Sequence, residues 1–275
     1  MHAARTSPAL GDRLNVAIEV AKAAGRITLD YFNSASLGIE EKADGTPVTE
    51  ADRNAELYIR DEIQMRFPDD GFMGEEFGSI AGTSGLRWIV DPIDGTKSFV
   101  HGVPLYGCLV AVEAMGANER DHESLVGVVH MPALGETVYA SRGGGAWCAQ
   151  GDAKPVQARV SATARLRDAM FVYTSHDYFK MTGQTEVLNA LLARCGHTRG
   201  WSDCYAHLLV ATGRADIVVE PAVLHPWDIA PMTVIVAEAG GRCTDWRGAA
   251  TAYGKTGVST NARLYDEVMA LIQGM

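Results

Sequence analysis

The spacing of apolar residues changes once along this chain, and that change limits the folds the chain can adopt. In the first part, apolar side chains recur at helical spacing, which predicts helices over residues 10–32 and 52–67. Short β-rich runs separated by Gly, Pro and Asn or Asp come next, and they predict a largely antiparallel sheet. These strands are expected at residues 88–90, 105–113, 125–131, 137–140 and 156–160.

From about residue 169 the pattern alternates between strand and helix. The chain is therefore predicted to have an α/β fold built from two tightly packed subdomains. Residues 1–152 are expected to form an α+β subdomain with the metal-binding motifs, and residues 153–275 an α/β subdomain that completes the site. In this second part, strands are expected at residues 170–173 and 217–219, and helices at residues 186–195, 203–212, 226–239 and 264–272.

Charge and cysteine content argue against several classes of protein. The net charge is −10 and the chain has no run of Lys or Arg, so nucleic acid is a poor partner. The five cysteines are scattered without a CxxC pair, which argues against a disulfide framework or a structural zinc site. Residues 1–15 lack the apolar core of a signal peptide, and no apolar run approaches the roughly 18 residues of a membrane span. We therefore expect a cytoplasmic protein without a membrane partner.

The most informative motif is a β-rich run that ends in two aspartates, Asp91 and Asp94. Pro92 fixes one backbone angle and Gly95 relieves steric limits, so both carboxylates can converge on one point. Mg²⁺ prefers oxygen ligands of this kind. The N–H groups of Gly95 and Thr96 could seat a phosphate if a helix begins there. Taken alone, the motif is equally compatible with a turn that contains an aspartate cap.

Two further acidic segments strengthen the metal interpretation. Glu75 and Glu76 lie in a Gly-flanked loop after the second predicted helix, where paired glutamates are usually solvated. Asp228 follows Pro226 at a predicted helix start, where aspartate is also a common cap. Each segment by itself has an ordinary structural explanation, so only their combination points to a metal site.

The combination resembles the inositol monophosphatase family over nearly the whole chain. The matching segments are Gly74–Glu76, Asp91–Thr96, Pro226–Asp228 and Glu238–Gly241. The resemblance implies a layered αβαβα sandwich and a Mg²⁺-dependent phosphomonoesterase acting on a small-molecule phosphate ester. It also implies a homodimer and inhibition by lithium, which can replace one Mg²⁺.

The resemblance assigns two to three Mg²⁺ ions to specific ligands. One ion would be held by Glu75, Asp91 and the backbone carbonyl of Ile93. A second would be held by Asp91, Asp94 and Asp228, and Glu75 would assist a weaker third.

The resemblance also implies the catalytic roles. Asp52 matches the family's acidic residue that partners the motif threonine, here Thr96, and Glu75 joins them as a catalytic residue. A water activated by the metal and oriented by Thr96 and Asp52 would attack phosphorus in line with the leaving oxygen. The phosphate would lie against Asp94, Gly95 and Thr96.

The expected substrate comes from the resemblance to one branch of the family. Residues 198–205 and 208–216, with Gly78 and Lys97, resemble the bacterial histidinol-phosphatases. Histidinol phosphate carries a protonated amine that acidic side chains could pair with. The expected substrate-binding residues are Lys97, Arg199, Asp203, Glu220 and Asp228.

Several alternatives remain open at this point. Asp203 could be a plain helix cap, Glu220 a strand-end charge and Arg199 a surface residue. The spacing from Glu220 to Asp228 is also one residue longer than the family pattern. Inositol 1-phosphate is the second substrate expected, followed by 3′-phosphoadenosine phosphate and fructose 1,6-bisphosphate. A metal-binding scaffold that has lost turnover is the alternative from another class.

Overall fold

Two helices form the outer layer of the first half. The computed structural model describes residues 8–34, 39–41, 47–201 and 203–274, so the start of the segment assessed for a signal peptide lies outside the described residues. The N-cap residue Thr49 accepts a hydrogen bond from Ala51, and Asp52 bonds back to Thr49, which fixes the start of the second helix. The elements are α1 (Pro8–Tyr31), β1 (Ile39–Glu41), β2 (Pro47–Thr49) and α2 (Glu50–Arg66).

These helices pack on an eight-stranded sheet with the order β10-β9-β8-β7-β6-β5-β3-β4. Only the β3–β5 pair is parallel, so the predicted largely antiparallel sheet is confirmed. The last strand, β10, covers Val156–Gln157 rather than 156–160, and it lies on this sheet beyond the predicted division at residue 152. The other elements are β3 (Gly71–Gly74), β4 (Gly78–Ile80), β5 (Leu86–Asp94), α3 (Thr96–Val100), β6 (Gly107–Ala114), β7 (Glu123–Met131), β8 (Glu136–Ser141) and β9 (Ala146–Gln150).

The second half contains a five-stranded sheet with the order β12-β11-β13-β15-β14. Strands β12, β11 and β13 are parallel, and β15 is antiparallel to both of its neighbours. The strands are β11 (Met170–Val172), β12 (His197–Arg199), β13 (Ile217–Glu220), β14 (Gly241–Thr244) and β15 (Gly257–Asn261). The helices are α4 (His176–Met181), α5 (Thr185–Arg194), α6 (Asp203–Ala211), α7 (Pro226–Glu238) and α8 (Tyr265–Gln273).

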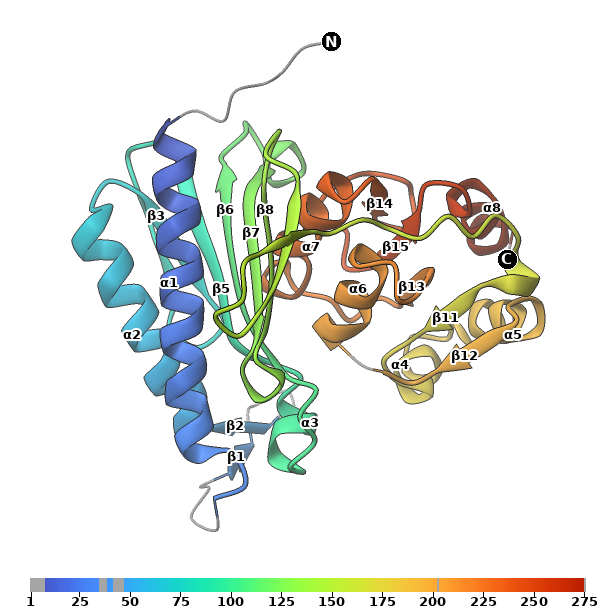
Figure 1. The fold of residues 1–275 in the computed structure, drawn as a ribbon, viewed down its shortest axis with the longest axis horizontal. Helices are drawn as coiled ribbons and strands as arrows, with labels where there is room; N and C mark the ends of the chain where they lie inside the picture. The colour runs from blue at the N-terminus through green and yellow to red at the C-terminus, as the bar shows by residue number, and fades with distance from the viewer. Residues whose placement is uncertain (1–7, 35–38, 42–46, 202, 275) are drawn as a thin grey trace.

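The elements stack in five layers, as Figure 1 shows: α1 and α2, the large sheet, α6 and α7, the small sheet, then α5 and α8. The central helix α7 is apolar around most of its surface because it packs against strands of both sheets. It approaches β7 so closely that a Cβ on Gly127 would stand 2.4 Å from the carbonyl oxygen of Pro231. The predicted αβαβα sandwich is confirmed.

A buried polar cluster joins the two halves near the start of β5. The guanidinium of Arg87 donates to Glu113 at 2.6 and 2.8 Å, and the hydroxyl of Tyr253 donates to the same carboxylate at 2.8 Å. The Glu113 side chain is 1% exposed. Tyr253 lies in the loop between β14 and β15, so this cluster joins that loop of the small sheet to strands β5 and β6 of the large sheet.

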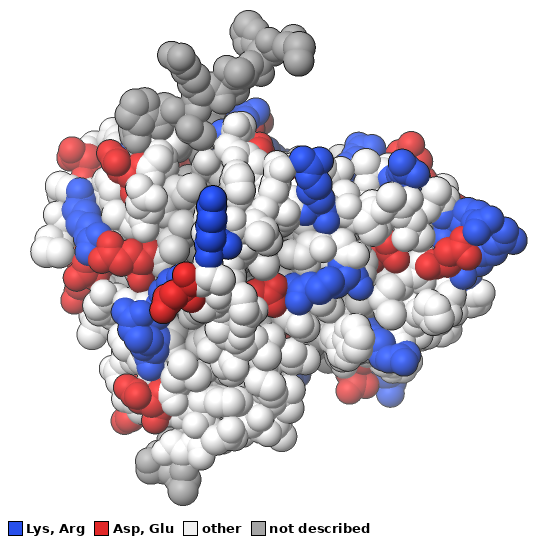
Figure 2. All heavy atoms as spheres, in the orientation of Figure 1, with Lys and Arg blue, Asp and Glu red and all other residues white. Residues whose placement is uncertain are grey.

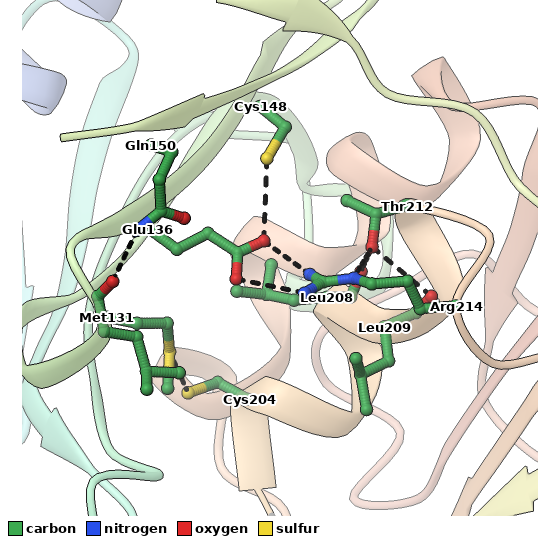
Figure 3. Close-up of polar contacts among 10 residues, drawn as sticks. Met131, Glu136, Cys148, Gln150, Cys204, Leu208, Leu209, Thr212 and Arg214 are labelled. Atoms are coloured by element: carbon green, nitrogen blue, oxygen red, sulfur yellow. Dashed lines mark hydrogen bonds and ion pairs between the residues drawn. The ribbon is translucent and has the colours of Figure 1, made fainter. Parts of the chain in front are cut away.

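A second polar contact joins β8 to the turn that follows α6 (Figure 3). Arg214 forms an ion pair with the buried carboxylate of Glu136, with Nη1 lying 3.2 Å from Oε2. Its Nε donates to the hydroxyl of Thr212 at 2.8 Å, and the thiol of Cys148 lies 3.5 Å from the same carboxylate. The two halves are thus joined by charged contacts at separate places.

Buried His207 on α6 leads to a prediction about pH and stability. Its Nδ1 lies 2.8 Å from the hydroxyl of Ser259, and burial lowers its pKa to about 4. Below about pH 6.5 the unfolded imidazole gains a proton that the folded one excludes, so this residue makes the protein less stable as pH falls towards 4. We expect the unfolding free energy of wild type, measured relative to that of His207→Asn, to decrease as the pH is lowered. The slope should approach about 1.4 kcal/mol per pH unit.

Urea denaturation of both proteins at pH 7, 6 and 5 checks this result. The comparison removes the opposite contribution of the buried carboxylates, whose pKa values are raised and which both proteins share. A difference in unfolding free energy that stays constant from pH 7 to pH 5 would contradict the prediction.

The distribution of charged side chains can be followed on one face of the molecule. On the face in Figure 2, the Lys and Arg side chains of the described residues are dispersed among acidic ones and form no continuous basic stripe. Among the helices of the described residues, none combines the length and apolar character that a membrane crossing requires.

Candidate active site

The end of β5 places Asp91 and Asp94 on a sharp change of backbone direction. The pairing of β5 with β6 shifts register between these two residues, and the N–H of Ile93 donates to Asp91 at 2.9 Å. Gly95 follows with a φ of +85°, a conformation that favours glycine, and α3 begins at Thr96. The local sequence therefore turns both carboxylates out of the sheet together.

The N-terminus of α7 brings a third carboxylate to this point. Oxygen atoms of Asp91, Asp94 and Asp228 all lie within 4.8 Å of one another. Asp228 also accepts the N–H of His225 at 2.7 Å, which fixes its side chain at the helix start. Oδ2 of Asp94 accepts the N–H of Cys204, at the start of α6, at 2.5 Å. The predicted cluster is thus assembled from both halves of the molecule.

The electrostatics of this cluster are unfavourable without a cation. Burial, together with the charges of Glu75, Asp94 and Asp228, holds the pKa of Asp91 well above its usual range. Burial and the neighbouring Asp203 raise the pKa of Asp94 to about 7. Burial and Asp94 likewise raise the pKa of Asp228. Converging carboxylate oxygens of this kind fit a hard divalent cation, which would offset their repulsion.

Glu75 lies in the turn between β3 and β4 rather than in an open loop. Its N–H donates to the carbonyl of Val90 at 3.2 Å, which ties the turn to β5 one residue before Asp91. A hydrogen bond with Glu75 contributes to the raised pKa of Asp91, so the two carboxyl groups meet. Glu76 follows in the same turn, and its N–H donates to Glu56 at 2.8 Å.

Asp52 and Thr96, which the resemblance pairs, each have another partner in the structure. The carboxylate of Asp52 accepts the N–H and the hydroxyl of Thr49 at 2.8 and 2.6 Å. The hydroxyl of Thr96 donates to the carbonyl of Ile93 at 3.1 Å. Asp52 is buried, and burial raises its pKa to about 7. Their joint catalytic role stays a prediction.

Asp203 and Glu220 are linked through a threonine that the sequence analysis missed. The hydroxyl of Thr174 donates to Glu220 at 2.6 Å and accepts the N–H of Asp203 at 3.0 Å. Glu220 is buried, and burial raises its pKa to about 8. Thr174 and Glu220 lie at the carboxyl ends of the parallel strands β11 and β13, a position where polar residues often form sites. That rule could have singled out Thr174.

Lys97 and Arg199 have different surroundings. Lys97 lies on α3, with its Nζ 3.3 Å from the hydroxyl of Tyr178 and 4.9 Å from the centre of its ring. Tyr178 lies on α4, so this contact bridges the two halves beside the carboxylates. Arg199 is exposed on the edge strand β12, and its guanidinium donates to the carbonyl of Thr198 at 2.7 Å. Its role in substrate binding stays a prediction.

Comparisons with known proteins identify the family of this chain. The family model described as "Inositol monophosphatase family" matches residues 10–274. The chain is 48% identical to the histidinol-phosphatase of Chlorobaculum parvum, covering 86% of each chain, and 39% identical to that of Mycobacterium tuberculosis, covering 94% of this chain and 96% of the relative.

A solved structure, the extragenic suppressor protein suhB from Bartonella henselae, superposes with a TM-score of 0.85 at 30% identity. The match covers 95% of this chain and 98% of that one. Sequence, structure and the arrangement of carboxylates agree with the resemblance found in the motifs. The chain belongs to the inositol monophosphatase family, and with it to the phosphoric monoester hydrolases.

Proposed function

We propose that this protein is a Mg²⁺-dependent phosphatase that hydrolyses histidinol phosphate to histidinol. The observation that carries the proposal is the meeting of Asp91, Asp94 and Asp228, with the acidic pair Asp203 and Glu220 beside them. The similarity to histidinol-phosphatases over most of both chains supports the choice of substrate.

Glu75, Asp91, Asp94, Asp228 and the carbonyl of Ile93 would hold the Mg²⁺ ions, two to three per site. When bound, Mg²⁺ would offset the charge of the phosphate ester and lower the pKa of a water molecule. The chain's own groups then position the reactants, which is most of the catalytic task in phosphoryl transfer.

The residues around β5 would orient the phosphate and the attacking water. The N–H groups of Gly95 and Thr96 would bind phosphate oxygens at the turn into α3. Because the hydroxyl of Thr96 donates to Ile93, its oxygen lone pairs are available to accept a hydrogen bond from water. Asp52, whose pKa burial raises to about 7, would accept the proton released as water attacks phosphorus.

The acidic pair would recognise the protonated amine of histidinol phosphate. The hydroxyl of Thr174 bonds the carboxylate of Glu220 and the backbone N–H of Asp203, and the negative charge of Asp203 lies close enough to contribute to the raised pKa of Glu220. An ammonium group between them would favour their charged forms. Inositol offers only hydroxyl groups, so it would gain less from this pair.

We expect Asp203→Asn to raise KM for histidinol phosphate by roughly 10- to 100-fold, as the loss of a hydrogen bond to a charged group implies. The change keeps the side-chain shape, and Asn tolerates the positive φ of 52° at this position. Steady-state kinetics with histidinol phosphate and inositol 1-phosphate check the result. An equal rise in KM for both substrates would show that Asp203 does not recognise the amine.

The proposed function itself is tested by phosphate release from four esters, each with and without Mg²⁺. They are histidinol phosphate, inositol 1-phosphate, fructose 1,6-bisphosphate and 3′-phosphoadenosine 5′-phosphate. A lead of tenfold or more in kcat/KM for histidinol phosphate supports the proposal. A lead for inositol 1-phosphate would assign the second substrate instead, and no turnover at all would favour the metal-binding scaffold.

We also propose that the enzyme is a cytoplasmic homodimer. All five cysteines are free thiols, which supports a reducing compartment. The homodimer is what the family resemblance implies. Sizing of the purified protein tests it, and a monomer at working concentration would exclude this assembly.

A further inference from the structure

The turn that carries Glu75 rests on a buried glutamate from α2. Glu56 is 0% exposed, and its two carboxylate oxygens accept the N–H groups of two consecutive turn residues. Oε2 accepts from Glu76 at 2.8 Å and Oε1 from Phe77 at 2.9 Å. A carboxylate that bonds two neighbouring backbone N–H groups fixes the direction of that backbone segment.

Gly74 provides the space for this contact. A Cβ at Gly74 would stand 1.9 Å from Oε1 of Glu56 and 2.4 Å from its Cδ, so no other residue fits without moving the glutamate. The backbone of Gly74 does not require glycine, because its φ lies outside the left-handed region. Glycine is therefore needed here for the close approach of Glu56.

Glu75 is held on both sides as a result. Its own N–H donates to Val90 on β5, and the next two N–H groups are bound by Glu56. Residue 74 is in register with Val90, so this double tether directs Glu75 towards Asp91. Its two hydrogen bonds direct the carboxylate of Glu56 at the backbone of the turn, and Glu56 is not among the three aspartates whose oxygens converge.

We propose that Glu56 is a positioning residue for the metal site: by holding residues 75–77 it sets the affinity of the enzyme for divalent cations without binding the cation or the substrate. This inference rests on the metal dependence in the proposed function. Partners that orient a metal ligand contribute about 10- to 100-fold to metal affinity.

The central test is Glu56→Gln. The shape is kept, but the amide NH₂ meets a backbone N–H, so one of the two bonds to the turn is lost. We expect the dissociation constant for Mg²⁺, measured with MgCl₂ by calorimetry, to rise 10- to 100-fold. The rise in melting temperature that MgCl₂ gives should shrink in parallel, and kcat at saturating Mg²⁺ should change far less than the Mg²⁺ requirement.

Two control variants on the same helix separate positioning from other effects. Ile59→Val removes one buried methyl group and lowers stability without touching the turn. Glu62→Gln removes a charge whose partner is Arg66. Both should keep the wild-type affinity for Mg²⁺, and a loss as large as that of Glu56→Gln in either would overturn the inference.

Gly74→Ala tests the same contact with every charge retained, and it forms one arm of a double-mutant cycle with Glu56→Ala. The added methyl group displaces Glu56, so the single variant should weaken Mg²⁺ binding by a similar factor. In a Glu56→Ala background the clash disappears, so Gly74→Ala should then have little further effect.

Two outcomes separate failure of this inference from failure of the proposed function. Wild-type affinity in Glu56→Gln, or additive effects in the cycle, would overturn the role of Glu56 and leave the phosphatase intact. A wild-type protein that binds no Mg²⁺ would overturn the proposed metal dependence, and the inference with it.

Discussion

Replacing Asp91 by Asn is expected to lower kcat/KM by roughly 10³-fold or more, the loss that several kcal/mol of charge stabilisation implies. Asp91 forms a hydrogen bond with Glu75 and also belongs to the cluster with Asp94 and Asp228. A neutral amide at this position should weaken the binding of each Mg²⁺ ion to which Asp91 is assigned as a ligand. Asp94→Asn should have an effect of the same size. Phosphate release at saturating MgCl₂ measures both.

The stability of the same variant provides an independent readout. Without metal, the buried aspartates repel one another, so Asp91→Asn should melt at a higher temperature than wild type in EDTA. The gain in melting temperature on adding MgCl₂ should be smaller than in wild type. An inactive variant that melts lower than wild type in EDTA would indicate damage to the fold and leave the metal role without support.

Removal of Glu113 is expected to cost about 3–5 kcal/mol of unfolding free energy. The side chain is buried between Arg87 and Tyr253, and truncation to Ala leaves the guanidinium of Arg87, which is only 14% exposed, without its partner. The loss is a large fraction of the 5–15 kcal/mol typical of a folded protein. Urea denaturation of Glu113→Ala measures it.

Glu19→Ala is the matched control for this prediction. Glu19 also pairs with an arginine, Arg66, at 2.7 Å, but its side chain is 55% exposed. Solvent screens such pairs, so the loss should stay below about 1 kcal/mol. Equal losses in the two variants would show that burial does not set the strength of the Glu113 cluster. Glu113→Ala should also reduce activity, because this cluster holds together the two halves that supply the carboxylates.

The long elements were predictable because their patterns are local. Helices α1, α2 and α7 bury one face or nearly all of their surface, and the spacing of apolar residues shows it. Strand β15 was missed because Gly257–Asn261 reads as a polar loop, although all five residues are buried. Ser259 is acceptable there because it meets His207, a contact that only the tertiary fold provides. Short strands such as β3, β4 and β12 carry too few residues for a pattern.

The residues of the site also differ in how far the sequence alone predicts them. Asp91 and Asp94 were predictable because strand, turn and helix start follow one another in sequence. Asp228 and Glu75 required the family resemblance, since nothing local distinguishes them from caps or solvated charges. Glu56 and Thr174 were missed because their importance depends on partners from other elements. Sequence motifs therefore predict the residues that bind the reactants more readily than the residues that position those binding residues.

The order in which the chain is synthesised determines when the three carboxylates of Asp91, Asp94 and Asp228 can come together. A ribosome releases β5 with Asp91 and Asp94 long before α7 with Asp228, and domains fold as units once their parts are available. Until α7 emerges, the nascent chain has neither the third carboxylate nor the helix that covers the inner face of the large sheet. The proposed ion that Asp91, Asp94 and Asp228 would share could therefore bind only completed molecules, so it would stabilise the finished enzyme rather than assist the folding of its first half.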